Sequence, residues 1–160
     1  MREYARDPLN EMNDQFLDNA LAKGDRCFAI LDGDILASYG WYSNNATSIS
    51  DELVFRFSAD WIYMYKGFTR SDYRGLRLHA LGMALALREY SKYGFRGIVS
   101  NVEANNYNSL KSVHRMGYHD IDKILALKLF GKYWIRTGQR CKSYGIELLV
   151  SNGIRQPRHV

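Results

Sequence analysis

The fold is decided by the stretch Thr69-Arg-Ser-Asp-Tyr-Arg-Gly-Leu-Arg-Leu-His-Ala-Leu81, which joins a predicted strand to a predicted helix. Before it, residues 61–68 alternate their side chains with the two-residue period of a strand. After it, residues 78–93 carry apolar side chains at the three- and four-residue spacings of an amphipathic helix. A strand that enters a helix through Arg74-Gly75 exposes backbone N–H groups at the helix N-terminus, which can bind an anion.

Other elements extend this α/β pattern in both directions. A helix is predicted over residues 9–22, before Lys23-Gly24. Two apolar runs between Cys27 and Tyr42 meet at Asp32-Gly33, a pair that suits the positive φ of a two-residue hairpin turn. The remaining elements are, in chain order, a polar loop at 43–51, a strand at 97–102, a helix from Asn105-Asn106 to Gly117, and strand-like segments at 121–135 and 145–150 with a turn at Gly131-Lys132.

Composition indicates one folded domain spanning residues 1–160. The chain has 160 residues, is 46% hydrophobic and 24% charged, and contains only 2 prolines, so it has enough apolar surface for a core. No apolar run approaches the ~20 residues of a membrane span, and the charged opening Met1–Asp7 does not resemble a secretory signal. We therefore expect a soluble cytoplasmic protein with no membrane span.

The cysteines and the charges restrict the partners. Cys27 and Cys141 are far apart and lack the close spacing of a zinc site, so we expect two free thiols and no metal. Residues 1–60 carry 5 basic and 11 acidic side chains, whereas residues 61–160 carry 17 basic and 6 acidic ones. The basic part predicts an anionic partner: nucleic acid, a membrane surface or a phosphate-rich cofactor.

A second motif follows the predicted strand at 97–102. It reads Glu103-Ala-Asn-Asn106-Tyr-Asn-Ser109 and closes with Gly117-Tyr118. Together with the Arg74-Gly75 loop, in this order and at this separation, it resembles the GNAT superfamily of acyl-CoA-dependent N-acyltransferases over about residues 9–136. The resemblance implies an α/β (α+β) fold: a mixed, mostly antiparallel twisted sheet with two splayed parallel central strands, flanked by helices.

The resemblance assigns the first motif to the pyrophosphate of coenzyme A. The family's loop has the form Gln/Arg-x-x-Gly-x-Gly/Ala, and Arg74 matches its first position, while Arg77 and His79 stand where glycines usually do. This departure leaves open a donor other than acetyl-CoA, such as a longer acyl-CoA or an acyl carrier protein. The residues expected to bind the cofactor are Tyr65, Gly67, Phe68, Arg74, Gly75, Leu76, Arg77, Leu78, His79, Asn106, Ser109 and Lys111.

The resemblance also implies direct attack of an amine acceptor on the thioester. Asn106 is expected to contact the pantetheine arm, and a backbone N–H near Tyr65 to Gly67 to bind the oxyanion. The tyrosine that often protonates the departing thiolate falls at Val113, so Tyr107, Ser112 and His114 are nearby substitutes. For the general base we expect Glu103 first and Asp60 second.

Three function classes remain open from the sequence. The first is the acyltransferase, and the second is a non-catalytic module that binds an acyl-CoA or an acyl carrier protein. The third is a nucleic-acid-binding domain, which we consider unlikely because the basic residues are dispersed and form no known nucleic-acid-binding motif. Family members usually carry a first strand and one or two helices before the Asp-Gly hairpin, and only 26 residues precede Cys27 here. We therefore expect either that the first strand is absent or that the chain is a shortened piece. A sheet edge left bare in this way could pair with a second copy in a homodimer.

Overall fold

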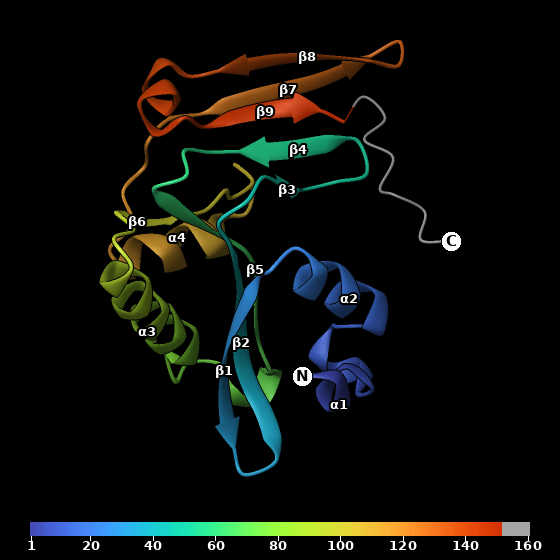
Figure 1. The fold of residues 1–160 in the computed structure, drawn as a ribbon, viewed down its shortest axis with the longest axis vertical. Coiled ribbons are helices and arrows are strands. Elements are labelled where there is room, and N and C mark those ends of the chain that lie inside the picture. Colours follow the sequence, from blue (N-terminus) through green and yellow to red (C-terminus); the bar gives the residue numbers. More distant parts are fainter. Residues whose placement is uncertain (152–160) are drawn as a thin grey trace. The chain divides into compact units, whose positions relative to one another are not determined.

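The aromatic segment at 61–68 forms β5 (Trp61–Thr69), an inner strand of a four-stranded sheet (Figure 1). The computed structural model describes residues 1–151, and within them the order of this sheet is β1-β2-β5-β6. The strands β1 (Arg26–Asp32), β2 (Ile35–Ser43) and β5 are antiparallel, whereas β5 and β6 (Gly97–Val99) are parallel. The mixed, mostly antiparallel sheet with one parallel pair is therefore confirmed.

The chain divides into two units, which we describe separately. The first unit comprises Met1–Asn45 and Ala59–Tyr118, and the second comprises Ala46–Ser58 and His119–Val160. In the second unit, β3 (Thr47–Ser48), β4 (Leu53–Arg56) and β9 (Glu147–Val150) form an antiparallel sheet. β7 (Ile124–Leu129) and β8 (Lys132–Thr137) form a hairpin that precedes the 3-10 helix η3 (Gln139–Tyr144). The single domain expected from composition stays a prediction.

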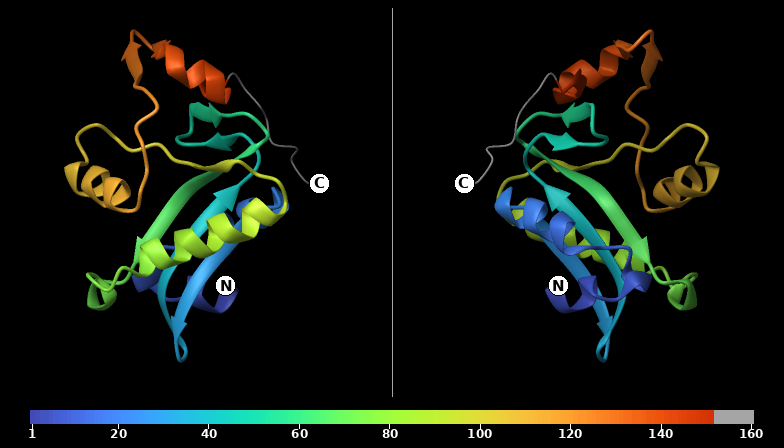
Figure 2. Two further views of the ribbon diagram at one scale, coloured as in Figure 1. Left: turned by 90° about the vertical axis from the view of Figure 1, so that its left-hand side faces the viewer. Right: turned by 90° about the vertical axis from the view of Figure 1, so that its right-hand side faces the viewer.

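Helices cover both faces of the sheet in the first unit. Figure 2 shows α3 (Leu78–Lys92) on one face and α2 (Asp14–Ala22) on the other. The core on the α2 side contains Met12, Leu17, Ala20, Leu36, Tyr39 and Trp41. The core on the α3 side contains Tyr42, Ile62, Ala86 and Tyr90. The two-residue alternation of β5 is confirmed up to Tyr65, because Ile62 and Met64 pack on the α3 side while Tyr65 packs beside Phe16 of α2. At Tyr65 the pairing with β2 shifts, and Phe68 then packs on the same side as Tyr65.

The buried face of α3 differs from the leucine stripe that its spacing suggests. The helix buries Gly82, Met83, Ala86 and Tyr90, whereas Leu81 and Leu85 remain exposed. Ala86 and Tyr90 pack with Tyr42 and Ile62 in the core on this side of the sheet. The contacts with the sheet thus decide which face is buried, rather than the spacing of the leucines.

The single helix expected over residues 9–22 is wrong. The N-terminal segment contains α1 (Arg2–Ala5), the 3-10 helix η1 (Pro8–Asn10) and then α2. Glu11 adopts the left-handed conformation with φ 50°, and the Asn13 side chain caps α2 by accepting a hydrogen bond from the N–H of Phe16 at 2.8 Å. An asparagine cap satisfies an N–H that the helix itself leaves free, so the helix begins after Asn13.

Both hairpin turns lie one residue away from the expected pair. The first turn is centred on Gly33-Asp34, with Asp32 facing Ile35, and only Gly33 has a positive φ. The second is centred on Phe130-Gly131, and both residues have positive φ. Register is set by cross-strand pairing along the whole hairpin, which the turn dipeptide alone does not reveal.

The segments around the second motif are shorter than expected. β6 ends at Val99, and α4 spans Tyr107–Arg115 with Asn106 as its N-cap. The chain between them is irregular and includes Ser100 to Glu103. This irregular segment follows the parallel strand pair directly.

The loop between β5 and α3 contains a strained residue. After the 3-10 helix η2 (Ser71–Tyr73), Gly75 has φ 85° and Arg77 has φ 59°. The left-handed region is easily reached by glycine but costs a residue with a Cβ atom roughly 1–2 kcal/mol. A glycine at position 77 would adopt this region at lower cost, and this chain holds it with an arginine.

The next turn of α3 packs closely on β5. A Cβ atom at Gly67 would collide with the imidazole of His79, so the absence of a side chain on Gly67 makes room for the ring. Burial lowers the pKa of His79 below its ordinary value of 6.5. The neutral imidazole is thus the form that fits against the strand.

Replacing Arg77 by glycine should raise the free energy of unfolding by about 1 kcal/mol, because the left-handed strain is removed. Urea denaturation measures the change. Arg88→Gly, in the exposed middle of α3, is the matched control and should lower stability by about 1 kcal/mol. A loss of stability with Arg77→Gly would contradict the left-handed conformation of Arg77.

Acidification should destabilise the protein through His79. Its lowered pKa means that the unfolded chain takes up a proton near pH 6.5 while the folded chain still resists protonation. Stability should therefore fall as the pH drops below about 6.5, and it should fall less steeply in His79→Asn. Urea midpoints between pH 7 and 5 measure both slopes, and equal slopes in the two proteins would disprove the assignment.

Candidate functional site

β5 and β6 separate after only three residues of parallel pairing. Residues 61–63 face residues 97–99, and beyond Tyr63 β5 continues to Thr69 with β2 as its partner. Ser100 Oγ donates to the carbonyl of Met64 at 3.1 Å, and the Tyr63 hydroxyl donates to Asn101 Oδ1. Among the described residues, no strand pairs with the rest of β5 on this side. The chain that follows β6 therefore lies beside an open stretch of strand edge.

Uncommitted backbone amides lie at the carboxyl end of β5. Within residues 1–151, no hydrogen bond is made by the N–H groups of Gly75, Leu76 or Arg77. The first turn of α3 has no acceptors of its own for its N–H groups, and Arg77 does not cap it with its side chain. The start of α3 thus presents a run of donors at the positive end of the helix dipole.

Two guanidinium groups flank these amides without a carboxylate partner. Arg70 is held by Asp7 at 3.3 Å, whereas Arg74 and Arg77 form no ion pair in the part of the chain that the structure describes. Both are exposed. Tyr73 fixes the preceding turn by donating to Asp32 Oδ2 at 2.8 Å. The loop therefore combines free amides with two free positive charges, which is the chemistry of a phosphate site.

The side chains of Tyr65 and Phe68 in β5 are engaged in contacts with neighbouring elements of the fold. Tyr65 donates its hydroxyl to Asp25 Oδ2 at 2.8 Å, and the Phe68 ring stacks on Tyr39 with centroids 5.4 Å apart. The backbone of Gly67 pairs with Gly40 of β2. Contacts from these three positions to a bound cofactor would therefore come mainly from the backbone, on the side away from β2.

The second motif lies at the N-terminus of α4. Asn106 Oδ1 accepts the N–H of Ser109 at 3.1 Å, which caps the helix. Tyr107 is 76% exposed, and Lys111 and His114 are also exposed. Val113 is partly buried. The polar groups of α4 are thus available to a ligand, while the position usually held by tyrosine faces inward.

The two candidate bases lie at opposite ends of the strand pair. Glu103 is exposed and follows the carboxyl end of β6, with its backbone carbonyl accepting the N–H of Asn106 at 2.9 Å. Asp60 precedes β5 and forms an ion pair with Arg96 at 3.1 Å. Glu103 thus lies two residues beyond Asn101, which contacts Tyr63 of β5, at the end where the two strands separate.

The sequence analysis did not identify three polar residues of this region. Ser100 and Asn101 bridge to β5 as described above. Tyr118, which closes the second motif, is half-buried, and burial raises its pKa to about 12. The third residue is Asp25. Asp25 lies beyond the C-terminus of α2 and meets Tyr65 from another element. The Lys-Gly-Asp sequence at a helix end was the available signal, since glycine at that position reverses the chain and turns the next residue inward.

The described residues offer neither a membrane-spanning helix nor a metal-ligand cluster. No helix in residues 1–151 is long and apolar enough to cross a bilayer. No cluster of His, Cys, Asp and Glu side chains in that range has the arrangement of metal ligands.

The comparisons with known proteins find similarity in structure rather than in sequence. No protein-family model and no curated protein sequence matches the chain significantly. The solved structure of AAC(6')-Iy with the bisubstrate analogue CoA-S-monomethyl-acetylneamine matches with a TM-score of 0.57 and 14% identity, over 70% of this chain and 76% of that chain. The aminoglycoside N-acetyltransferase AAC(6')-Iy in complex with CoA matches with a TM-score of 0.54 and 15% identity, over 69% of this chain and 86% of that chain.

A third structure extends this result beyond one enzyme. The aminoglycoside acetyltransferase meta-AAC0020, from an uncultured soil metagenomic sample and in complex with trehalose, matches with a TM-score of 0.56 and 10% identity, over 75% of each chain. The neighbours share with this chain the mixed sheet flanked by helices, and identity this low shows the fold alone. The chain has the GNAT-like acyltransferase fold.

Proposed function

We propose that the protein is an N-acyltransferase that moves an acetyl or longer acyl group from a coenzyme A thioester to an amine by direct attack. The observation that carries this proposal is the loop at residues 74–79, where free amides and two unpaired arginines meet at the start of α3. Two of the similar structures contain CoA or a CoA conjugate, which supports the same class of donor.

The loop fits the phosphates of coenzyme A. The amides of residues 75–80 would donate to the pyrophosphate, and Arg74 and Arg77 would supply charge. Lys111 of α4 would contact the 3′-phosphate. The backbone of β5 from Tyr65 to Phe68 would bind the arm of the cofactor along its unpaired edge, with Asn106 and Ser109 on the other side.

The reaction requires a base that accepts the proton of the amine, a hydrogen-bond donor to the oxyanion and an acid that protonates the leaving thiolate. We assign the first role to Glu103 rather than Asp60, because the Asp60 carboxylate is held by Arg96 at the far end of β5. A backbone N–H of β5 would bind the oxyanion of the tetrahedral intermediate. Tyr107 and His114 are the exposed groups of α4 that would protonate the leaving thiolate, since Val113 has no proton to donate.

The proposal also includes the class of acceptor and the cellular compartment. AAC(6')-Iy is an aminoglycoside N-acetyltransferase, and an amine of this kind is a candidate acceptor for the present protein. Both cysteines are free, which fits the reducing cytoplasm. An acyl carrier protein as donor, or binding without turnover, are the competing outcomes of the experiments below.

Calorimetric titration with CoA and acetyl-CoA should show micromolar binding that weakens at high salt. Arg74→Ala and Arg77→Ala should each lower the affinity by about tenfold, the effect of losing a hydrogen bond to a charged group. Arg88→Ala on the exposed surface of α3 should bind like the wild type. Absence of binding to any thioester, or unchanged binding by Arg74→Ala, would disprove the phosphate site.

Thiol release from acetyl-CoA in the presence of an aminoglycoside or an alkyl diamine should report turnover. Glu103→Gln should lower kcat by about 100-fold, as expected when a general base is removed, with little change in the KM for the thioester. The matched control is Glu89→Gln on α3. Binding of acetyl-CoA without thiol release for any amine would favour the non-catalytic module.

A further inference from the structure

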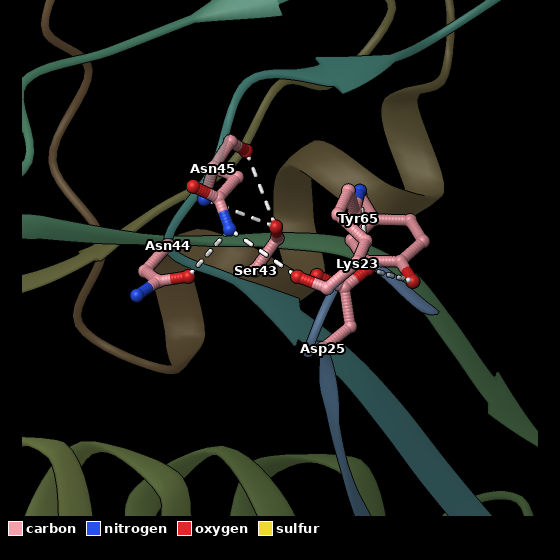
Figure 3. Close-up of polar contacts among 6 residues, drawn as sticks. All are labelled: Lys23, Asp25, Ser43, Asn44, Asn45 and Tyr65. Atoms are coloured by element: carbon pink, nitrogen blue, oxygen red, sulfur yellow. Dashed lines mark hydrogen bonds and ion pairs between the residues drawn. The ribbon is translucent and has the colours of Figure 1, made fainter. Parts of the chain in front are cut away.

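An ammonium group of the chain occupies a niche built from a carboxylate and an aromatic ring. Lys23 Nζ lies 3.0 Å from Asp25 Oδ2 and 4.9 Å from the centroid of the Tyr65 ring. The Tyr65 hydroxyl donates to the same carboxylate oxygen (Figure 3). The Asp25 side chain is fully buried, whereas the Lys23 side chain is 28% exposed. Lys23 and the half-buried Tyr65 are therefore the parts of this niche that meet solvent.

The backbone holds this niche in place before any ligand arrives. Gly24 has φ 82° and, with Asp25, closes the end of α2 through hydrogen bonds to Leu21 at 3.0 Å and Ala20 at 2.9 Å. This turn sets Lys23 and Asp25 on either side of the glycine. Asn45, from the end of β2, donates to the Lys23 carbonyl at 3.3 Å (Figure 3). Three elements thus fix the position of the carboxylate.

Half of the buried carboxylate has no partner. Asp25 Oδ1 is buried and accepts no hydrogen bond from the described residues, while Tyr65 and Lys23 both use Oδ2. A carboxylate accepts up to about four hydrogen bonds. A buried acceptor without a donor is costly, so this oxygen favours the entry of a further N–H group.

Aromatic rings on the same face extend the preference for cations. Phe16 lies 6.2 Å from Tyr65 and 5.4 Å from Trp41, between ring centroids. A second ammonium of the chain, Lys66 Nζ, lies 5.3 Å from the Phe16 centroid. Cations over aromatic faces are attracted by the ring quadrupole, and this effect strengthens when water is excluded.

We propose that Asp25 and Tyr65 form a recognition site for an alkylammonium group of the acceptor, which displaces Lys23. The site holds a protonated nitrogen, whereas the attacking nitrogen must be neutral, so the acceptor is a diamine or polyamine that carries both. Tyr65 connects the niche to the open strand edge through Tyr63, whose ring lies 6.1 Å away and whose hydroxyl contacts Asn101. The Lys23 ammonium would thus compete with the ammonium group of the acceptor for Asp25 and the Tyr65 ring.

The identity of the acceptor rests on the proposed function, whereas the ammonium site is testable without turnover. Lys23→Ala leaves the Asp25 carboxylate buried beside an empty space and should lower Tm. Millimolar n-butylammonium chloride should restore part of this loss, while n-butanol and sodium chloride should not. Lys23→Ala/Asp25→Asn should show no recovery, and neither should Lys92→Ala, which loses an exposed pair with Glu89. Equal Tm values of Lys23→Ala with n-butylammonium and with sodium chloride would overturn the site.

Kinetics with 1,5-diaminopentane and acetyl-CoA tests the role in acceptor binding. Lys23→Gln keeps most of the side chain but removes the charge, and it should lower the KM for the diamine severalfold. Asp25→Asn should raise this KM by about tenfold or more while kcat changes little, the loss expected for one charged contact. The same two substitutions should change the KM for n-pentylamine less, because this amine has no second nitrogen to occupy the niche.

The two experiments separate the possible failures. Recovery of Tm without thiol release from any amine would support the ammonium site and reject the acyltransferase. Thiol release with the diamine, with a KM that neither variant changes, would support the acyltransferase and overturn the role of Asp25. A lower Tm of Lys23→Ala that no ammonium ion restores would show that the ion pair is purely structural and would likewise overturn it.

Discussion

The short parallel pairing of β5 with β6 is the constraint on which the candidate site depends. Its amino end is clamped: Arg96 donates its N–H to the Asp60 carbonyl at 2.8 Å, pairs with the Asp60 carboxylate and lies over the Trp61 ring. Its carboxyl end is stopped where Ser100 turns its hydroxyl to the carbonyl of Met64. Between these two contacts only three residue pairs form, so the rest of β5 keeps a free edge. Asp60 thereby has a structural task at the end where the strands stay together.

The loop that follows β5 is held in an unfavourable backbone conformation. Arg77 is left-handed, and the turn before it is tied to the first hairpin through Tyr73 and Asp32. Strain of this kind persists where surrounding contacts impose it, and it is concentrated at functional sites. An arginine at this position adds a positive charge beside the amides that a glycine would lack. Conformational stability and anion binding therefore make opposite demands on residue 77.

A second unfavourable feature lies on the opposite side of β5. Asp25 is a buried carboxylate with one satisfied oxygen, placed there by the glycine turn that ends α2. Burial of a charge is tolerated when partners compensate it, and here the compensation comes from a lysine two residues away and a tyrosine of another strand. One strand thus borders a cationic loop at its carboxyl end and a buried carboxylate beside Tyr65. In the proposed reaction the loop would bind the anionic donor and the carboxylate would bind the cationic acceptor.

Local features of the sequence were sufficient for the elements whose own side chains decide their structure. The alternation of β5, the helix at 78–92, the Asn106 cap and the Arg-Gly loop all follow from residues close together in the chain. The divided N-terminal helix was missed because a cap at Asn13 competes with an apolar pattern that continues through it. The turn positions were missed by one residue because pairing along both strands sets the register.

Tertiary structure alone decided the rest. The buried face of α3 contains Gly82, Met83, Ala86 and Tyr90 rather than its leucines, and only the contacts with the sheet show this. The bridge from Tyr63 to Asn101 and the niche of Asp25, Lys23 and Tyr65 join residues that are distant in sequence, so no spacing could reveal them. By itself the sequence determined the hairpin of β1 and β2, the strands β5 and β6, the helices α3 and α4 and the charged loop before α3, because helix caps, strand alternation and glycine turns act over a few residues. It did not reveal α1, β3 or β4, and β3 lies in the segment expected to be a polar loop. The length of the parallel pairing and the burial of a carboxylate were decided by packing, because both depend on contacts between segments brought together only by the folded chain.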